Sequence, residues 1–396
     1  MSWILTLVVL VILILAFVSR AKSRQAAVTA QPLSTVPARA GRTLLVMAGG
    51  TGGHIFPALA VAKAMRERGW DVVWLGAAGA METRIVPQHD IPLETLAITG
   101  VRGKGLVKKL AQPWVQLKAL YGSLRTIFRH RPDVAIGFGG FTGFPGGLAM
   151  RLLWLPLVVH EQNSVAGLTN KALSKLASRV LFAFPSAFRT APPRFDCVGN
   201  PVRDAITAVA EPAQRFAGRS GPLKLLVVGG SLGAQVFNEQ VPKALALLPE
   251  AERPVVIHQA GEKHIDALKA NYAAAGVAAE CAAFIGDMAG AYADADLVLC
   301  RAGALTVSEL ACVGAAAVLV PFPHAVDDHQ TGNARYLSDA GAGVLLQQSE
   351  FGAERFAALL KETNRARCLA MAQKARQLAK PDATERVVAV IEELAR

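Results

Sequence analysis

Cysteine is scarce in this 396-residue sequence, and its pattern argues against two classes of protein. The chain has five cysteines, an odd number, and no two of them have the Cys-x-x-Cys spacing of many metal and redox sites. A small domain held together by disulfides and a structural zinc module are therefore both unexpected. The pattern fits a protein of a reducing compartment.

Charged and aromatic residues are also sparse, at 18% and 6%, whereas 52% of the residues are hydrophobic. This apolar content excludes a disordered chain, and the length allows two to three domains. Acidic residues are fewer than basic ones, 30 against 42, and the net charge of +12 favours an anionic partner. A nucleic acid is the least supported such partner, because the sequence has no recognition motif and no interleaving of aromatic and basic residues. A membrane surface or a phosphorylated substrate remains.

The N-terminus carries a long apolar run, residues 3–18, in which Thr6 is the only polar residue. A helix of this length just spans a thin hydrocarbon core. Basic residues follow the run and none precedes it, which is the reverse of a secretory signal peptide. The positive-inside rule then places the rest of the chain in the cytoplasm. We therefore expect a transmembrane anchor at 1–20 and a proline-containing tether at 21–42.

A strand-like segment, a glycine-rich turn and a helix-like segment occur in this order twice. The first copy runs from 43–48 into the turn GGTGGH at 49–54, and the second runs from 223–228 into GGSLGA at 229–234. Glycines at such a turn let the chain bend sharply and bring backbone amides close to a ligand at a helix N-terminus. The repetition makes the pattern more informative than one turn alone.

Further short apolar segments alternate with helix-like segments along the whole chain. They are residues 72–75, 134–136, 157–159, 255–257, 297–299 and 317–320. This alternation predicts an α/β protein with two parallel sheets flanked by helices, that is, two Rossmann-like domains. We expect one domain at 43–202, the other at 203–377 and a last helical segment at 378–396, which Asp382 and Glu385 would cap. Ligands of such paired domains bind outside the carboxyl ends of the strands.

Two common nucleotide-binding motifs are absent. Neither glycine turn has the GxGxxG spacing of dinucleotide-binding domains, and no acidic residue ends the second strand. No GK[ST] sequence follows either turn, which excludes a P-loop. Asp294 and Asp296 form a DxD sequence just before a strand, where a capping or turn role is expected, and we assign no metal to them.

The segment RAGALTVSE at 301–309 is the most specific chemical signal of the second half. A strand is expected to end at Cys300, and a helix is expected to begin at about Leu305. The backbone amides at this helix start suit a diphosphate. Glu309, one turn into the helix, could accept hydrogen bonds from a ribose diol, although in isolation an exposed helix carboxylate would be the ordinary interpretation.

Five motifs in a fixed order resemble the MurG family of bacterial peptidoglycan synthesis. They are GGTGGHIFPALA at 49–60, HEQN at 160–163, GNPVR at 199–203, RAGALTVSE at 301–309 and DATERV at 382–387. The resemblance extends over residues 43–396. It implies the two-domain glycosyltransferase B fold, here with an added N-terminal transmembrane helix, and a last helix that returns to the N-terminal domain.

The resemblance also implies the reaction and its place. The family transfers N-acetylglucosamine, with inversion, from UDP-N-acetylglucosamine to undecaprenyl-diphosphate-muramyl-pentapeptide (lipid I), which makes lipid II. No metal and no other cofactor is expected. The expected location is the cytoplasmic side of the bacterial inner membrane, in contact with its anionic lipids. A transferase acting on diacylglycerol or a lipid A precursor is one alternative, which the combination of TGGHIFP and HEQN disfavours. A membrane-anchored, non-catalytic nucleotide-sugar-binding protein is another, which the intact His54, Glu309 and Gln330 disfavour.

Carried over motif by motif, the resemblance implies these site residues. Thr51, Gly52 and Gly53 would lie near the sugar and the acceptor diphosphate. Asn163 and Arg203 would contact the donor, and Ser231 its phosphates. Ile285 would pair with uracil through its backbone, and Gln330 would contact the sugar hydroxyls. The diphosphate and ribose would be held by Ala304, Leu305, Thr306, Val307, Ser308 and Glu309.

His54 is our candidate for the general base, because it follows the first glycine turn and its imidazole can take a proton near neutral pH. A histidine at a helix start can instead serve only to orient the turn.

A second surface is expected to face the membrane. Residues 99–105 form a basic, glycine-rich loop, after which Leu106, Leu110 and Trp114 recur at every fourth position. The basic residues around this apolar stripe are Lys104, Lys108, Lys109 and Lys118. Such a combination suits anionic headgroups. A core-facing amphipathic helix is the ordinary alternative, but a lipid acceptor favours the membrane.

Overall fold

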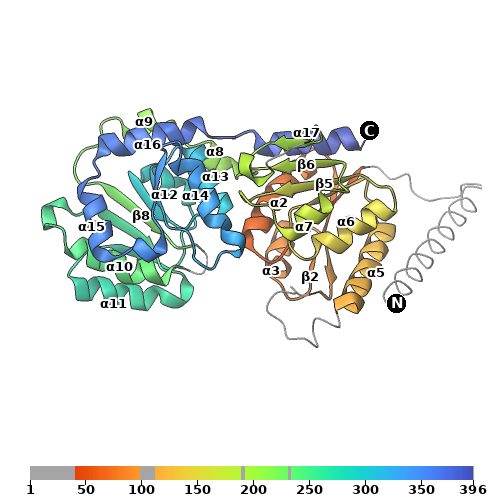
Figure 1. Ribbon diagram of the computed structural model, residues 1–396, viewed down its shortest axis with the longest axis horizontal. Coiled ribbons are helices and arrows are strands. Elements are labelled where there is room, and N and C mark those ends of the chain that lie inside the picture. Colours follow the sequence, from red (N-terminus) through yellow and green to blue (C-terminus); the bar gives the residue numbers. More distant parts are fainter. Residues whose placement is uncertain (1–40, 99–111, 189–191, 231–232, 396) are drawn as a thin grey trace, which may run out of the picture.

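The computed structural model describes residues 41–98, 112–188, 192–230 and 233–395, which form two α/β domains side by side (Figure 1). The anchor expected at 1–20 and nearly all of the tether lie outside these ranges. Within them, no helix is long and apolar enough to cross a membrane.

The first domain contains a seven-stranded parallel sheet with the order β3-β2-β1-β4-β5-β6-β7. Its strands are β1 Thr43–Met47, β2 Asp71–Ala77, β3 Leu93–Leu96, β4 Val134–Gly137, β5 Leu157–Glu161, β6 Arg179–Phe182 and β7 Phe195–Cys197. Its helices are α2 Gly52–Glu67, α3 Glu82–Ile85, α5 Gln112–His130, α6 Gly143–Leu152 and α7 Leu168–Leu173. The central strands are buried along their whole length and mostly apolar, because helices cover the sheet on both faces.

The second domain repeats this plan with a six-stranded parallel sheet of order β10-β9-β8-β11-β12-β13. Its strands are β8 Lys224–Val228, β9 Val255–Gln259, β10 Glu280–Ala282, β11 Leu297–Cys300, β12 Ala317–Leu319 and β13 Gly343–Leu345. Its helices are α8 Asp204–Thr207, α9 Pro212–Phe216, α10 Gln235–Ala246, α11 Ile265–Ala275, α12 Met288–Asp294, α13 Ala304–Val313, α14 His329–Ser338, α15 Ala353–Lys361 and α16 Arg365–Gln377.

The prediction of two parallel-sheet domains is confirmed, and every strand expected from the sequence coincides with a strand of the structure. Five strands escaped the sequence analysis: β3, β6, β7, β10 and β13. Four of these are the edge strands of the two sheets. Edge strands are short and only half-covered, so their apolar pattern is too brief, or too often interrupted by polar residues, to be recognised.

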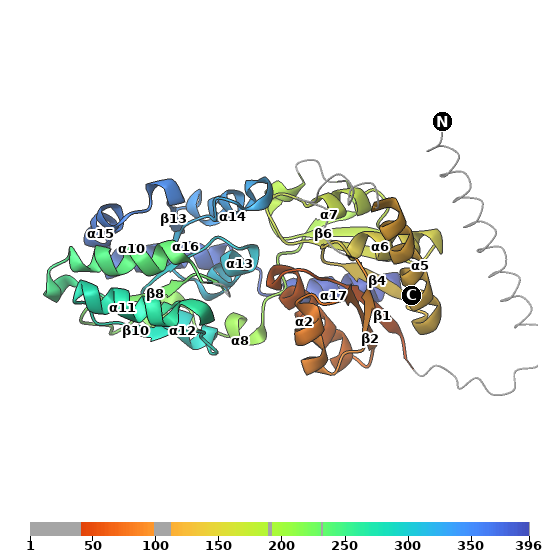
Figure 2. The ribbon, with the colours of Figure 1, turned by 90° about the horizontal axis from the view of Figure 1, so that it is seen from below.

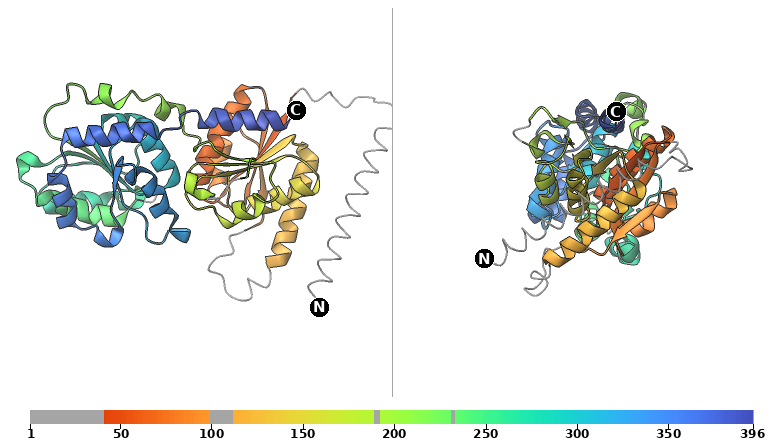
Figure 3. Two further views of the ribbon diagram at one scale, coloured as in Figure 1. Left: turned by 45° about the horizontal axis from the view of Figure 1, so that its top comes forward. Right: turned by 90° about the vertical axis from the view of Figure 1, so that its right-hand side faces the viewer.

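The last helix, α17 Ala383–Leu394, lies against the first domain although the helix before it covers the second (Figure 3, left). Val387, Val388 and Ile391 are buried in the same core cluster as the apolar face of α2. The prediction that Asp382 and Glu385 cap this helix is wrong. The Asp382 side chain makes no capping hydrogen bond, and Glu385 pairs with Arg68 of the first domain. The chain therefore ends by joining its two domains.

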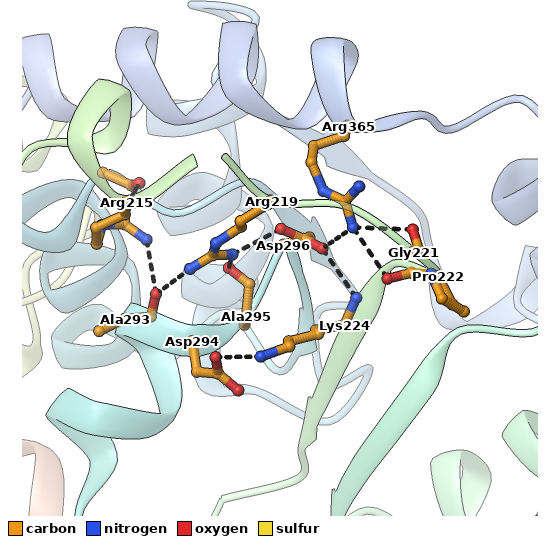
Figure 4. Close-up of polar contacts among 11 residues, drawn as sticks. Arg215, Arg219, Gly221, Pro222, Lys224, Ala293, Asp294, Ala295, Asp296 and Arg365 are labelled. Atoms are coloured by element: carbon orange, nitrogen blue, oxygen red, sulfur yellow. Dashed lines mark hydrogen bonds and ion pairs between the residues drawn. The ribbon is translucent and has the colours of Figure 1, made fainter. Parts of the chain in front are cut away.

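The DxD sequence also has a role other than the expected cap or turn. The carboxylate of Asp296 is fully buried and accepts hydrogen bonds from Arg219 at 2.6 Å, from Arg365 at 3.1 Å and from the Lys224 amide at 3.0 Å (Figure 4). Burial alone raises the pKa of Asp296, but these hydrogen bonds outweigh burial and hold the pKa below its ordinary value. Asp296 thus joins the start of α16 to the first residue of β8, a central strand of the second sheet.

Replacing Asp296 with alanine should lower the free energy of unfolding by about 3 kcal/mol, because two arginines would lose the charge they are buried against. Urea denaturation followed by circular dichroism measures this. Asp294 is the matched control, since it is half-exposed and pairs with Lys224 at the surface (Figure 4). Its replacement by alanine should cost under about 1 kcal/mol. Equal losses in the two variants would contradict the structural role of Asp296.

Candidate active site between the two domains

Two helix N-termini from different domains meet at the carboxyl ends of the sheets. Helix α2 begins at Gly52, within the first glycine-rich turn, with Thr51 as its N-cap residue. Helix α13 begins at Ala304 after Gly303. The two helices contact each other, and they lie at the junction of the domains in two perpendicular views (Figures 1 and 2). The first turn of each helix presents amides that have no partner within the helix, which suits an anionic ligand.

His54 lies in the first turn of α2 and is oriented by the glycine turn itself. Its Nδ1 lies 3.2 Å from the carbonyl oxygen of Gly49 and 3.4 Å from the hydroxyl of Thr51. A carbonyl oxygen can only accept, so Nδ1 carries the proton and Nε2 is the basic nitrogen.

The surroundings of His54 keep its imidazole neutral near pH 7. Burial lowers the pKa of His54, while the charges of Glu161 and Glu82 and the Gly49 carbonyl raise it, and His329 lowers it. The net pKa lies below the ordinary value. A neutral imidazole with an available Nε2 has the form that a general base requires.

The HEQN motif is a buried hydrogen-bonded unit at the end of β5. The Nε2 of His160 donates to the carbonyl oxygen of Gly199 at 2.9 Å, and its Nδ1 accepts from Gln162 at 3.0 Å. Glu161 accepts hydrogen bonds from the amides of Asn163 and Gly167 and from the side chain of Asn170. The motif therefore joins the GNPVR segment to the loop that carries Asn163.

Hydrogen bonds cross from this loop to the second domain. Asn333 of α14 donates to Asn163 Oδ1 at 3.3 Å and accepts from the Ser164 amide at 2.8 Å, while the Ser164 hydroxyl donates to the His329 carbonyl oxygen. Asn200 donates to Ser308 of α13 at 3.0 Å. Residues from both domains thus form one continuous polar site.

Glu309 is buried, so the interpretation as an exposed helix carboxylate is wrong. Arg203 donates to its Oε1 at 3.3 Å, and the buried hydroxyl of Tyr292 donates to its Oε2 at 3.3 Å. Burial raises the pKa of Glu309, and its two partners offset only part of that effect. Arg203 is half-exposed and Glu309 buried, so a ligand could meet the pair from the Arg203 side.

The other expected residues occupy more varied positions. The side chains of Ala304 and Val307 are buried, so only their backbone can meet a ligand, whereas Leu305 and Thr306 are partly exposed in the first turns of α13. Ile285 packs against the core of the second domain, and the Gln330 side chain accepts from the Phe322 amide. Ser231 lies outside the described residues.

Of the expected membrane stripe, only Trp114 and Lys118 fall within the described part of the chain. Trp114 is 68% exposed on α5, so the core-facing alternative fails for this residue. Leu106, Leu110 and the basic loop before them are not described.

Five polar residues around the site were missed by the sequence analysis: Glu82, Glu161, Asn170, Tyr292 and Asn333. Glu161 belongs to HEQN, which could have drawn attention to it. The other four lie far apart in the sequence and have no local signal, because folding alone brings them to the site.

Two Rossmann-like domains with a polar site at the ends of both sheets are the arrangement of the two-domain glycosyltransferases, and the family matches assign the chain to that class. Residues 44–182 match the glycosyltransferase family 28 N-terminal domain, and residues 224–387 match the glycosyltransferase family 28 C-terminal domain. Within that class, the chain belongs to the MurG family.

Particular relatives show how extensive the similarity is. The chain is 58% identical to the UDP-N-acetylglucosamine--N-acetylmuramyl-(pentapeptide) pyrophosphoryl-undecaprenol N-acetylglucosamine transferase of Thiobacillus denitrificans, over 91% of this chain and 100% of the relative. It is 57% identical to the protein of the same name from Cupriavidus metallidurans, over 89% and 98%. The crystal structure of Acinetobacter baumannii MurG matches with a TM-score of 0.78 and 44% identity, over 89% of this chain and 99% of that one.

The buried histidines predict how stability depends on pH. Burial lowers the pKa of His160 to about 4 and that of His258, in β9, to about 3. Between these values and about 6.5, the unfolded chain binds protons that the folded chain does not. Each histidine therefore stabilises the fold fully above pH 6.5, and this contribution is lost as the pH falls.

Lowering the pH from 7 to 5 should thus reduce the free energy of unfolding by on the order of 2 kcal/mol for each of these histidines. Urea denaturation at the two pH values measures the loss. The variant His258→Gln should lose about 2 kcal/mol less than the wild type over the same interval. An identical loss in both proteins would contradict a neutral, buried His258.

Proposed function

We propose that this chain transfers N-acetylglucosamine from UDP-N-acetylglucosamine to lipid I, with lipid II and UDP as products. This is the reaction that the names of its full-length relatives describe. The observation that carries the proposal is the pairing, at one interdomain site, of a neutral histidine on α2 with the N-terminus of α13 and the Arg203–Glu309 pair. These features supply a base for an acceptor hydroxyl and positive potential for a departing diphosphate.

The second domain would hold the donor. The carboxylate of Glu309 accepts hydrogen bonds from the hydroxyls of the ribose, and the amides at the start of α13 bind the diphosphate, helped by the helix dipole. The backbone of Ile285 pairs with uracil, and Ser231 contributes to the phosphate site. Arg203 would contact the donor, which the half-exposure of its guanidinium beside Glu309 supports. Asn163 and Gln330 contact the sugar.

The first domain would hold the acceptor and carry out the proton transfer. The glycine turn with Thr51, Gly52 and Gly53 binds near the acceptor diphosphate. The acceptor oxygen attacks the anomeric carbon, its proton passes to Nε2 of His54, and the bond to the β-phosphate oxygen breaks with its electron pair leaving on UDP. Each donor to the leaving diphosphate typically contributes on the order of 3 kcal/mol to the transition state.

UDP release from UDP-N-acetylglucosamine and a lipid I analogue tests the reaction and the base together. The wild type should release UDP with lipid I and not with diacylglycerol; the reverse preference would refute the proposed function. His54→Ala should reduce kcat by about 100-fold to 10,000-fold, because proton transfer is lost, and leave the Kd for UDP within about twofold. If kcat survives in this variant, the base is another group.

We also propose that the protein works at the cytoplasmic face of the bacterial inner membrane, held by an N-terminal anchor at 1–20 and by α5. Trp114, Tyr121 and Phe128 are exposed on α5 at seven-residue spacing, which places them on one side of the helix. Lys118 and Arg125 lie between them on the same exposed side. Aromatic side chains that alternate with cations suit the interface of an anionic bilayer.

Flotation with vesicles of phosphatidylglycerol and phosphatidylethanolamine tests both contacts. Deleting residues 1–40 should make binding salt-sensitive, because only the α5 contact remains. In that shortened chain, the double variant Trp114→Ala/Tyr121→Ala should lower the bound fraction at least about fivefold. Leu247→Ala, a half-exposed apolar residue of the second domain, is the control and should change nothing. Unaltered binding by the double variant would exclude α5 as a membrane contact.

A further inference from the structure

The carboxylate of Glu82 lies completely buried beneath the first glycine turn. Glu82 is the first residue of α3, and its Oε1 accepts a hydrogen bond from the Ala77 amide at 2.8 Å, at the end of β2. Its Oε2 accepts from the Gly50 amide at 3.1 Å, inside the glycine turn. Among the described residues, no Lys or Arg lies within ion-pair distance of it. Two backbone amides therefore take the place of a cation.

Two glycines make room for this carboxylate. A Cβ atom at Gly49 would lie 2.3 Å from Oε1 of Glu82, and one at Gly76 would lie 2.7 Å from its Cγ. Any larger residue at either position would displace the Glu82 side chain. The buried Glu82 side chain therefore explains why position 49 is a glycine, without reference to any ligand.

The contact with Gly50 also determines which amides of the turn are available. Because the Gly50 amide points down to Glu82, it is not directed at a ligand. The amides of Gly52 and Gly53 belong to the first turn of α2, where the helix provides no acceptor for them. The glycine turn therefore presents the amides of the helix start, and His54 follows directly.

We infer that Glu82 is a positioning residue for the transfer reaction, which fixes the first glycine turn and holds His54 in place through the Gly49 carbonyl. This inference rests on the proposed function, because it acts through the candidate base. The negative charge of Glu82 has a second effect. Like the charge of Glu161 on β5, it raises the pKa of His54, whereas burial and the His329 imidazole from α14 lower that pKa. Glu82 would thus adjust both the geometry and the basicity of His54.

The variant Glu82→Gln tests this in the full-length chain with UDP-N-acetylglucosamine and a lipid I analogue. The glutamine amide group would face a backbone N–H where an oxygen now accepts, so the turn must shift. We expect kcat to fall by about 10-fold to 100-fold, as misplaced catalytic groups do. The Kd for UDP, bound by the other domain, should stay within about twofold.

The pH profile of kcat separates positioning from a merely structural role. Activity of a base-catalysed transfer rises as the base loses its proton, so the acidic limb follows the pKa of His54. Removing the negative charge of Glu82 lowers that pKa, and the acidic limb should move to lower pH. Glu82→Asp keeps the charge but shortens the reach; its kcat should fall while the limb stays in place.

Glu67→Gln is the matched control, because Glu67 is an exposed carboxylate at the end of α2, and it should behave as the wild type. Gly49→Ala should reproduce the kcat loss of Glu82→Gln by steric displacement. If Glu82→Gln does not fold, the inference is tested with Gly49→Ala and Glu82→Asp instead. A wild-type kcat in both of these variants would overturn it. An unchanged kcat and acidic limb in a folded Glu82→Gln also overturns it. An inactive wild type would refute the proposed function rather than the role of Glu82.

Discussion

The hydrogen bonds that join the HEQN loop to α14, and Asn200 to α13, are the constraint on which the site depends. Asn333 contacts both Asn163 and the Ser164 amide from the opposite domain, and its amide group also donates to the Ala302 carbonyl oxygen. Because Asn333 is fully buried, these bonds are shielded from competing water. They place the helix start that carries His54 opposite the helix start that suits a diphosphate. Helix α17 links the domains separately, because it follows α16 of the second domain and packs against the core of the first.

Buried carboxylates serve three different purposes in this molecule, and their partners distinguish them. Asp296 is held by two arginines and keeps its charge for stability, far from the site. Glu309 has one half-exposed arginine and one tyrosine, which leaves it accessible to a ligand from one side. Glu82 has only backbone amides, so its charge acts on the glycine turn and on His54. The partner, rather than the carboxylate itself, determines the role.

The fold alone would not have revealed the reaction. Such folds carry many acceptor specificities. The full-length similarity to the MurG family and the polar groups between the domains are what favour transfer of N-acetylglucosamine to a lipid-linked acceptor.

The sequence by itself determined the class of fold, the central strands and the glycine turns, because buried parallel strands and tight turns have strong local patterns. It also identified His54, Arg203 and Glu309 as candidates through motifs. It did not reveal the edge strands, whose half-exposed patterns are weak, nor that Glu309 is buried and that Asp296 is an ion-pair centre. Only the tertiary structure decided that Glu82 lies beneath the first glycine turn and that Asn333 joins the domains. Such contacts form because packing brings together segments that are far apart in the sequence, and no local sequence pattern shows which segments will meet.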